Sequence, residues 1–503
     1  MVIILRKILD RKIILKFLSI GFILILAIAI GVKSKIELAR EEWISDFDYV
    51  CEIIETTSLQ LNNYDAFYGT NFKNNKNNCR QKILSCKNDF EFYCILKKFL
   101  NNIPSIHTTV QFPEIQLHGY NDEELLQQSE FINKSSAHWE YELKNNVQKY
   151  SDAKFFLFYY VDGNYYLYET DGSLFCITEI NDIPSDLYIT DKSAGCKLMF
   201  DNINRKSFKP LMIFNDKYGE KIRINGIDEN ERPVSKNLFY SEYSEISWYY
   251  LNPSVTDEYI DNIKIYKDIN TSTAYLEIRS LKNISNSEKQ KNNIHSALEM
   301  ENIIIDLRYC SGGSTDYFFD NILSLLITDN LTVNDSFEFP LNEHTAYFKK
   351  KYSDYVTLNT DKMTGYYSRD YSICSMSDRK HKIYVLVNSG TMSAADQAAY
   401  IFKKYKIGTL IGENTGGEGR TGSYMSAVLP SSGLILTYNI GMCDDADIFG
   451  TSPDIYVNCG VGSYLKKMKI NKCCDAESYE NRLKWDNVLI ETLELMKEKE
   501  NVK

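Results

Sequence analysis

Ser393 stands between an expected buried strand and an expected helix, where a hydroxyl group could act as a nucleophile. Ile383–Val387 is a wholly apolar run rich in β-branched residues, which is typical of a buried strand. A turn-prone stretch follows, and the Ala, Ile and Phe spacing from Ser393 onward predicts a helix. Backbone N–H groups at such a helix start can bind an oxyanion, and the helix dipole favours developing negative charge. The alternative is that Ser393 is only the N-cap of the helix.

A second candidate feature is a glycine pair that follows another expected strand. Ile303–Leu307 is expected to form a strand, and the loop after it contains Gly312 and Gly313. Glycines at the C-terminal end of a strand let the backbone approach a ligand closely. A turn without a functional role is the alternative. Cys310 lies beside this loop, but no residue pattern supplies a base for a cysteine nucleophile.

Three segments together resemble the C-terminal processing peptidases, also called tail-specific proteases, and the tricorn core protease. They are the strand, DLR and glycine-pair loop of Asn302–Phe318, the serine segment Lys382–Gly422, and the closing segment Ile448–Val457. All three occur in the order that this family has. The resemblance implies an α/β fold with a crotonase-like catalytic core and a serine nucleophile that hydrolyses peptide bonds. It also implies an oxyanion hole made by the N–H of Ala394 and an N–H of the glycine pair.

The base that would activate the serine differs between two branches of this family. The tail-specific branch places a lysine at the position where this chain has Glu418, and the nearby Arg420 stays protonated. The tricorn-like branch uses a histidine in a D-G-H-T segment. Ser105-Ile106-His107-Thr108 is similar to that segment, with Ser and Ile in place of Asp and Gly. The resemblance therefore favours His107 as the base, whereas an isolated histidine after a helix is otherwise a surface residue.

A carboxylate is then needed to orient the histidine and stabilise its charged form. In the tricorn-like branch this residue comes three positions before the glycine of the closing segment, which places it at Asp447. Asp444 and Asp445 lie close by and remain alternatives, as does a solvated carboxylate without a catalytic role. The resemblance thus implies an acyl-enzyme mechanism in which Asp447 orients His107 and His107 deprotonates Ser393. No metal ion and no organic cofactor is required.

The N-terminus carries an apolar run that predicts a membrane span. Phe17–Val32 is uncharged and almost wholly apolar, and residues 13–32 match the ~20 residues that a membrane-spanning helix needs. Basic residues precede this run, so residues 1–12 should be cytoplasmic and the rest of the chain outside. A cleaved secretory signal is the alternative, because Ala27-Ile28-Ala29 offers a small-residue cleavage site. The protein would then be secreted rather than anchored in the cell membrane.

The composition of the chain limits the classes of partner that it can bind. The chain has 503 residues, enough for two or three domains, and a formal net charge of −11. This charge argues against nucleic acid or an anionic membrane surface as the main partner, and a polypeptide substrate remains. The twelve cysteines could pair outside the cytoplasm, and the six histidines form no ligand-spaced cluster with them. By proximity alone the candidate pairs are Cys79 with Cys86, Cys176 with Cys196, and Cys459 with Cys473 or Cys474.

The remaining chain divides into four expected regions. Residues 33–112 form an N-terminal helical region that carries His107, with helices at Leu38–Leu61 and Phe90–Leu100 and an exposed Asn-rich loop at Asn71–Asn78. Residues 113–265 are β-rich, with hairpin turns at Asp162-Gly163 and Asp171-Gly172. Residues 266–475 form the peptidase core, whose alternating strands and helices predict a largely parallel sheet. Residues 476–503 contain a C-terminal helix that packs on the core.

Two features of these regions leave alternatives open. The stretch Asn181-Asp182-Ile183-Pro184 resembles a turn of PDZ modules, without its glycine, and such modules bind C-terminal peptides at a sheet edge. A plain β insert is the alternative. Asp306 and Arg308 flank the end of a strand and are expected to form a buried structural ion pair rather than a substrate clamp.

Three rival functions remain at the level of sequence. The first is a non-catalytic binding or scaffold protein on the same fold, because a fold alone does not determine function. The second is another acyl hydrolase, such as an esterase. The third is a Ser–Lys dyad that uses a lysine elsewhere in the chain.

Overall fold

The computed structural model describes most of the chain from residue 40 onward. The described residues are 40–58, 61, 71–103, 105, 107–113, 128–151, 157–161, 163–168, 174–192, 199–201, 206–208, 211–213, 221–228, 230–239, 263–268, 272–282, 292, 294–420, 422–441, 443, 450–457, 483 and 486–501. The expected anchor at 13–32, the turn at Asp171-Gly172 and the candidate acids Asp444, Asp445 and Asp447 lie outside them. Of the helices in these ranges, none combines the length and the apolar character needed to cross a membrane.

The core is a six-stranded sheet in the order β11-β12-β13-β17-β18-β21. Neighbouring strands from β12 to β21 pair in parallel, and β11 is antiparallel to β12. The largely parallel sheet expected from the sequence is therefore confirmed. Its strands are β11 (Ile263–Asp268), β12 (Thr273–Ile278), β13 (Asn302–Asp306), β17 (Lys382–Val387), β18 (Thr409–Gly412) and β21 (Ile455–Tyr456).

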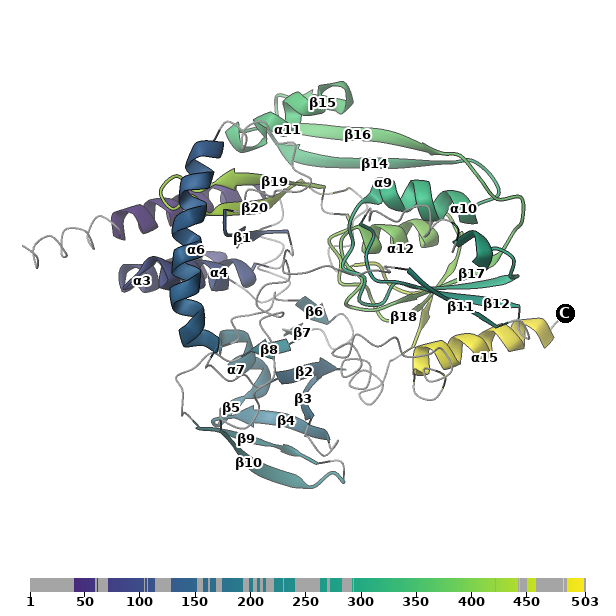
Figure 1. The fold of residues 1–503 in the computed structure, drawn as a ribbon, viewed down its shortest axis with the longest axis horizontal. Helices are drawn as coiled ribbons and strands as arrows, with labels where there is room; N and C mark the ends of the chain where they lie inside the picture. The colour runs from purple at the N-terminus through teal and green to yellow at the C-terminus, as the bar shows by residue number, and fades with distance from the viewer. Residues whose placement is uncertain are drawn as a thin grey trace, which may run out of the picture.

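Helices cover both faces of this sheet (Figure 1). Strands β12 and β13 are buried along their whole length, as continuous apolar strands are between two helical layers. On one face lie α9 (Thr315–Phe318), α10 (Ser324–Leu326) and α12 (Ala394–Lys404). On the other face lies α15 (Asn487–Asn501), which buries Val488, Leu489 and Met496. The expected C-terminal helix thus packs on the core.

A buried ion pair joins the central sheet to the start of α15. The Arg308 side chain is only 3% exposed and donates to both oxygens of Asp306 and both oxygens of Asp486. Tyr275 also donates its hydroxyl to Asp306. Because these groups satisfy one another inside the protein, the expected structural role of Asp306 and Arg308 is confirmed.

The N-terminal region is helical, with one correction to the sequence analysis. A helix at 40–57 packs with α3 (Phe72–Leu84) and α4 (Asp89–Asn101). The exposed loop expected at Asn71–Asn78 was wrong, because most of it forms the first turns of α3. Asn71 caps this helix by accepting from the N–H of Asn74, and Phe72 is buried against the neighbouring helices.

The suggested disulfide between Cys79 and Cys86 is also wrong, since both are buried free thiols. Burial raises the pKa of each thiol to about 12. The other suggested pairs each include at least one cysteine outside the described residues.

A small antiparallel sheet connects the N-terminal region to the second half of the chain. Its order is β1 (Thr109–Gln111), β20 (Ile435–Ile440) and β19 (Ser423–Val428). In β1, Thr109 lies opposite Thr437 of β20. This pairing carries the segment just before β1 toward the core.

A long arm also links the core to the N-terminal helices (Figure 1). It consists of β14 (Leu331–Pro340) and β16 (Thr364–Ile373), with β15 (Val356–Asn359) at its far end. Between β14 and β15 lie η3 (Glu343–Thr345), α11 (Ala346–Lys351) and η4 (Ser353–Tyr355). Aromatic side chains of the arm pack into the same cluster as the helix at 40–57. This arm was not expected from the sequence.

The region 113–265 contains helices as well as strands. The helix α6 (Ser129–Ser151) was not expected; its Trp139 is buried and donates to the carbonyl of Ser432. The sheet has the order β10-β9-β4-β3-β2-β8, with β5 paired to β4, and β6 and β7 form a separate pair. After α6, the elements of this region are β2 (Leu157–Val161), β3 (Asn164–Tyr168), β4 (Leu174–Ile180), β5 (Ile183–Pro184), α7 (Ser185–Lys192), β6 (Met199–Asp201), β7 (Lys206–Phe208), β8 (Leu211–Ile213), β9 (Lys221–Ile227) and β10 (Pro233–Phe239).

Two turns in this region follow the sequence analysis. The antiparallel pair β2 and β3 closes at Val161 and Asn164, as a hairpin at Asp162-Gly163 requires. Asn181 and Asp182 both adopt positive φ values, 49° and 64°, and turn the chain from β4 into β5. Asn and Asp tolerate this conformation better than other non-glycine residues, so the turn forms without the glycine.

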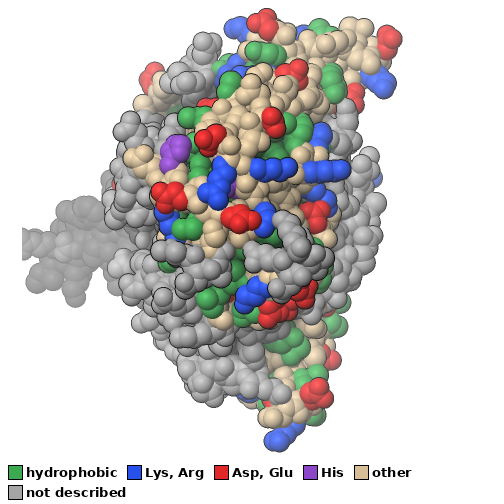
Figure 2. Space-filling model, turned by 90° about the vertical axis from the view of Figure 1, so that its right-hand side faces the viewer, with side chains coloured by type: hydrophobic (Ala, Val, Ile, Leu, Met, Phe, Trp, Pro, Cys, Tyr) green, Lys and Arg blue, Asp and Glu red, His purple; other side chains and the backbone are tan. Residues whose placement is uncertain are grey.

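The described surface carries charges of both signs. Figure 2 shows acidic and basic side chains interspersed on one face, among polar and apolar ones. Such a mixed face does not provide the continuous basic surface that a nucleic acid would require.

Candidate active site

Ser393 occupies a strained turn between β17 and α12. Its φ of 56° and ψ of −128° are unusual for any residue other than glycine. Such a conformation costs about 1–3 kcal/mol and persists only where the surrounding structure enforces it, which is common at functional sites. The Ser393 side chain makes no capping hydrogen bond to α12. The alternative that it is only an N-cap is therefore not supported.

Two loops hold this turn in place. The N–H of Met392 donates to the carbonyl of Cys310 at 3.0 Å, and the N–H of Ser393 donates to the carbonyl of Gly417 at 3.0 Å. The carbonyl of Ser393 accepts from the N–H of Gln397 in the first turn of α12. The strained backbone is thus fixed on both sides, and the Ser393 hydroxyl is left available.

His107 lies beside that hydroxyl. Its Nε2 is 3.0 Å from Oγ of Ser393, within the hydrogen-bond range expected of a general base. The half-buried imidazole stacks on the ring of Tyr424, with centroids 5.0 Å apart and planes 7° from parallel. The hydroxyl of Thr437 donates to the carbonyl of His107 at 2.8 Å. Strands β19 and β20 therefore position a histidine that comes from the N-terminal region.

The loop that carries His107 is fastened by a polar network that the sequence analysis missed. The hydroxyl of Ser105 donates to Oε2 of Glu418 at 3.1 Å and accepts from the N–H of Thr108 at 3.2 Å. Asn439 donates its amide hydrogens to Ser105 and to Glu418, both at 2.9 Å. Glu418, at the position of the lysine in the tail-specific branch, is thus an acceptor that holds the histidine loop. The available signal was Ser105, because serine often bonds to the backbone of its own turn.

The glycine pair lies against the serine. Gly312 has φ +89°, and a Cβ on it would come within 2.7 Å of the Ser393 Cβ and 2.9 Å of the Ala394 nitrogen. Gly313 has φ +146° and packs against the backbone of Leu281 instead. Among the described residues, no acceptor binds the N–H of Gly313 or Ala394. Two donors near the nucleophile are therefore available to an oxyanion.

Cys310 does not have the properties of a nucleophile. Its side chain is fully buried, and burial raises the pKa of the thiol to about 12 even though the N–H of Gly312 acts in the opposite direction. The thiol is therefore protonated and inaccessible at neutral pH, whereas a reactive cysteine needs an exposed thiolate. Its carbonyl contributes by binding Met392.

A second buried acid, Asp396 on α12, supports the loops around the site. It accepts from the hydroxyls of Thr415 and Thr451 and from the N–H groups of Thr451 and Gly419. Burial raises the pKa of this carboxyl, and the four hydrogen bonds lower it. Because Asp396 connects the helix after Ser393 to the loop that carries Glu418, we regard it as a positioning residue. This role of Asp396 was not expected from the sequence.

The site combines a strained serine at a strand-to-helix turn with a histidine within hydrogen-bond distance and two available N–H donors. This combination is that of a serine hydrolase. Residues 272–457 match the model of Peptidase family S41. This segment contains Ser393 and the glycine pair, so the chain carries a domain of peptidase family S41 and is a serine-type peptidase.

Solved structures with a similar fold include mature CPAF, at a TM-score of 0.50 and 12% sequence identity, covering 87% of this chain and 99% of that chain. At this identity the likeness shows the fold alone. A photosystem II D1 C-terminal processing protease matches at a TM-score of 0.37 and 13% identity, covering 83% of this chain and 93% of that one. The tricorn protease matches at 0.34 and 12%, covering 85% of this chain and 35% of that one. Curated proteins provide no match.

Proposed function

We propose that this protein is a membrane-anchored, outward-facing serine peptidase that hydrolyses polypeptides through an acyl-enzyme. The observation that carries the proposal is the 3.0 Å separation between His107 Nε2 and Ser393 Oγ, at a serine with a strained backbone. A serine hydroxyl is a weak nucleophile at neutral pH and needs an adjacent base. Among the described residues, His107 hydrogen-bonds to the Ser393 hydroxyl.

In the first half-reaction His107 removes the proton from Ser393 as Oγ attacks the carbonyl carbon of the scissile peptide. The oxygen of that carbonyl becomes an oxyanion, which the N–H of Ala394 and an N–H of the pair Gly312 and Gly313 stabilise. The tetrahedral intermediate then collapses, and His107 gives its proton to the leaving amine. In the second half-reaction water attacks the acyl-enzyme with the same proton transfers, which releases the acid product and restores Ser393.

We assign the orienting carboxylate to Asp447, with Asp444 and Asp445 as alternatives. The support is the resemblance of the segment before Gly450 to the tricorn-like branch. A carboxylate would hold His107 in the tautomer whose Nε2 accepts the serine proton, and would stabilise the imidazolium. The chemical step requires no metal ion or organic cofactor.

The proposed membrane anchor and domain organisation rest on the sequence patterns described above. Residues 13–32 would anchor the protein with residues 1–12 in the cytoplasm, and a cleaved signal with secretion is the alternative. Residues 266–475 would form a crotonase-like core, which the parallel sheet from β12 to β21 supports. Residues 33–112 would supply the base, and residues 476–503 a closing helix. Residues 113–265 would form a β-rich, PDZ-like region, with a plain β insert as the alternative.

Measuring the turnover of a protein substrate and of a small ester distinguishes a peptidase from an esterase. The full chain in detergent is given a fluorescently labelled unfolded protein and, separately, a small activated ester. We expect release of labelled peptides by the wild type and a loss of at least about 10³-fold in Ser393→Ala and His107→Ala. Turnover of the ester without turnover of the protein would favour another acyl hydrolase. Activity that survives His107→Ala would contradict the assigned base and favour a lysine elsewhere.

A further inference from the structure

Three possible metal ligands converge on the side of the molecule where the arm meets the N-terminal helix. Glu52 comes from the helix at 40–57, and Glu343 and His344 come from η3 in the arm. Each side chain offers one ligand atom, and these atoms lie within 4.8 Å of one another. Ser393 and His107 are not part of this group.

His344 has a buried ring nitrogen that makes no hydrogen bond within the described part of the chain. Its side chain is 7% exposed, and none of the described residues hydrogen-bonds to its Nε2. Oε1 of Glu52 is 3.9 Å from this nitrogen, which is too far for a hydrogen bond. Leaving a buried polar group unsatisfied has a free-energy cost in the folded state. A ligand between the imidazole and the carboxylate would remove that cost.

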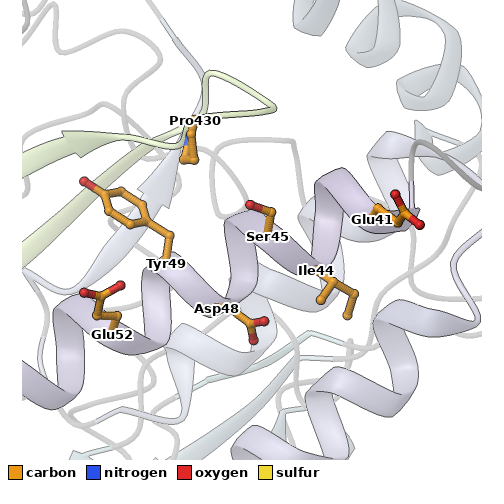
Figure 3. A pocket seen from close by; sticks show the side chains of 7 residues that line it. All are labelled: Glu41, Ile44, Ser45, Asp48, Tyr49, Glu52 and Pro430. Atoms are coloured by element: carbon orange, nitrogen blue, oxygen red, sulfur yellow. The ribbon is translucent and has the colours of Figure 1, made fainter.

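The two carboxylates are not neutralised by basic side chains. In the described part of the chain, no Lys or Arg forms an ion pair with Glu52 or Glu343. Glu52 also lines a pocket of about 540 Å³, in which Glu41 adds a further negative charge and Asp48 is ion-paired with Arg80 (Figure 3). The pocket gives a cation access from solvent to Glu52. Together these features produce a negatively charged site that includes one imidazole nitrogen.

The backbone around the ligands is already fixed. Asn342 and Thr345 form a reciprocal capping box around Glu343 and His344, and the hydroxyl of Tyr438 donates to the carbonyl of His344 at 2.9 Å. Asn342 also donates to the carbonyl of Thr56 at 2.8 Å, which ties η3 to the helix that carries Glu52. Metal binding would therefore require side-chain movements but no reordering of the backbone.

We propose that Glu52, Glu343 and His344 bind a divalent transition-metal ion that joins the N-terminal helix to the arm. One imidazole and two carboxylates suit Zn²⁺ and neighbouring ions, at bond lengths of about 2.0–2.2 Å. Solvent supplies the remaining coordination position. Because the ion binds the folded chain and bridges two segments far apart in sequence, it should stabilise the folded state.

Zn²⁺ binding to the full chain, purified free of metal in detergent, tests this proposal by competition with a chromophoric chelator. Wild type is compared with Glu52→Gln and Glu343→Gln, which keep side-chain size and remove one charged ligand each. Glu42→Gln is the matched control, since Glu42 is an exposed acid on the same helix, about 15 Å along its axis from Glu52.

We expect one Zn²⁺ equivalent whose affinity falls at least about tenfold in both ligand variants and stays unchanged in the control. Zn²⁺ should also raise the Tm of the wild type and of Glu42→Gln more than that of the ligand variants. Equal affinity in all four proteins, or no Zn²⁺ binding by folded wild type, would overturn the proposal. A thiolate charge-transfer band with Co²⁺ in place of Zn²⁺ would also overturn it, because cysteines would then be the ligands.

Discussion

Nε2 of His107 lies 3.0 Å from Oγ of Ser393, although 286 residues separate them in the chain. The pairing of β1 with β20 explains this proximity, because Thr109 lies opposite Thr437 only two residues after the histidine. The backbone of β20 binds the N-terminal strand, and Thr437 also binds the carbonyl of His107. The N-terminal helical region is therefore a part of the candidate site.

The contact between Gly312 and the serine turn predicts a selective loss of reactivity in Gly312→Ala. The new Cβ would lie 2.7 Å from both the Ser393 Cβ and the Met392 carbonyl oxygen, at a positive φ that alanine rarely adopts. The oxyanion donors and the nucleophile should shift relative to each other. A misplacement of about 1 Å can reduce the rate by about 10²-fold. The measurement is the rate of covalent labelling by a fluorophosphonate, corrected for folded protein.

Gly433→Ala is the control for this prediction. Gly433 also has a positive φ, +70°, and its Cβ would meet the side chain of Ser135 rather than the site. We expect a lower Tm with normal labelling per folded molecule. Equal losses of labelling in the two variants would show that the effect of Gly312→Ala is general destabilisation.

The network around Glu418 predicts that removing its carboxylate disturbs His107 indirectly. In Glu418→Ala the hydroxyl of Ser105 and the amide of Asn439 lose their shared acceptor. The labelling rate of Ser393 should fall by about tenfold or more, since the histidine loop is no longer fixed. Glu418→Gln keeps a side-chain oxygen and should restore most of the rate. Failure of the glutamine to restore it, at unchanged Tm, would mean that the negative charge itself is needed.

The lowered pKa of Lys97 predicts that the free energy of unfolding rises with pH. Its Nζ is buried and donates to Thr109 Oγ1 and to the carbonyl of Val110, and burial lowers its pKa from 10.5 to about 8. Between these values the unfolded chain binds more protons than the folded one, so this lysine makes stability rise with pH. Its contribution to the slope approaches ~1.4 kcal/mol per pH unit.

Lys97→Met should remove that contribution. We expect the free energy of unfolding, from urea denaturation at pH 7.5 to 9.5, to rise less steeply with pH in this variant than in the wild type. Lys73→Met, which replaces an exposed lysine on α3, should keep the wild-type slope. The same slope in Lys97→Met and wild type would contradict the lowered pKa.

The elements that the sequence predicts well are those whose local pattern and final burial agree. The apolar runs of β13 and β17 and the Ala-rich start of α12 are buried as their patterns require. The Asn-rich start of α3 was misjudged because its polar residues indicate a loop, whereas the burial of Phe72 and Ile83 stabilises a helix. Tertiary packing therefore outweighs local propensity there.

Within the site, motif residues could be predicted and supporting residues could not. Ser393, His107 and Gly312 stand in recognisable segments, and the structure brings them together. Ser105, Glu418 and Asn439 come from three separate segments, and Ser105 reaches the other two only once β1 pairs with β20. No local pattern in the sequence records a contact of that kind.

Mapping of a fluorophosphonate adduct tests the Ser393–His107 pair most directly. The full chain is labelled and digested, and the modified residue is read by peptide mass spectrometry in wild type, Ser393→Ala and His107→Ala. The account predicts an adduct on Ser393 in the wild type and none in either variant. An adduct on Ser393 that persists in His107→Ala, or no adduct in folded wild type, would contradict it.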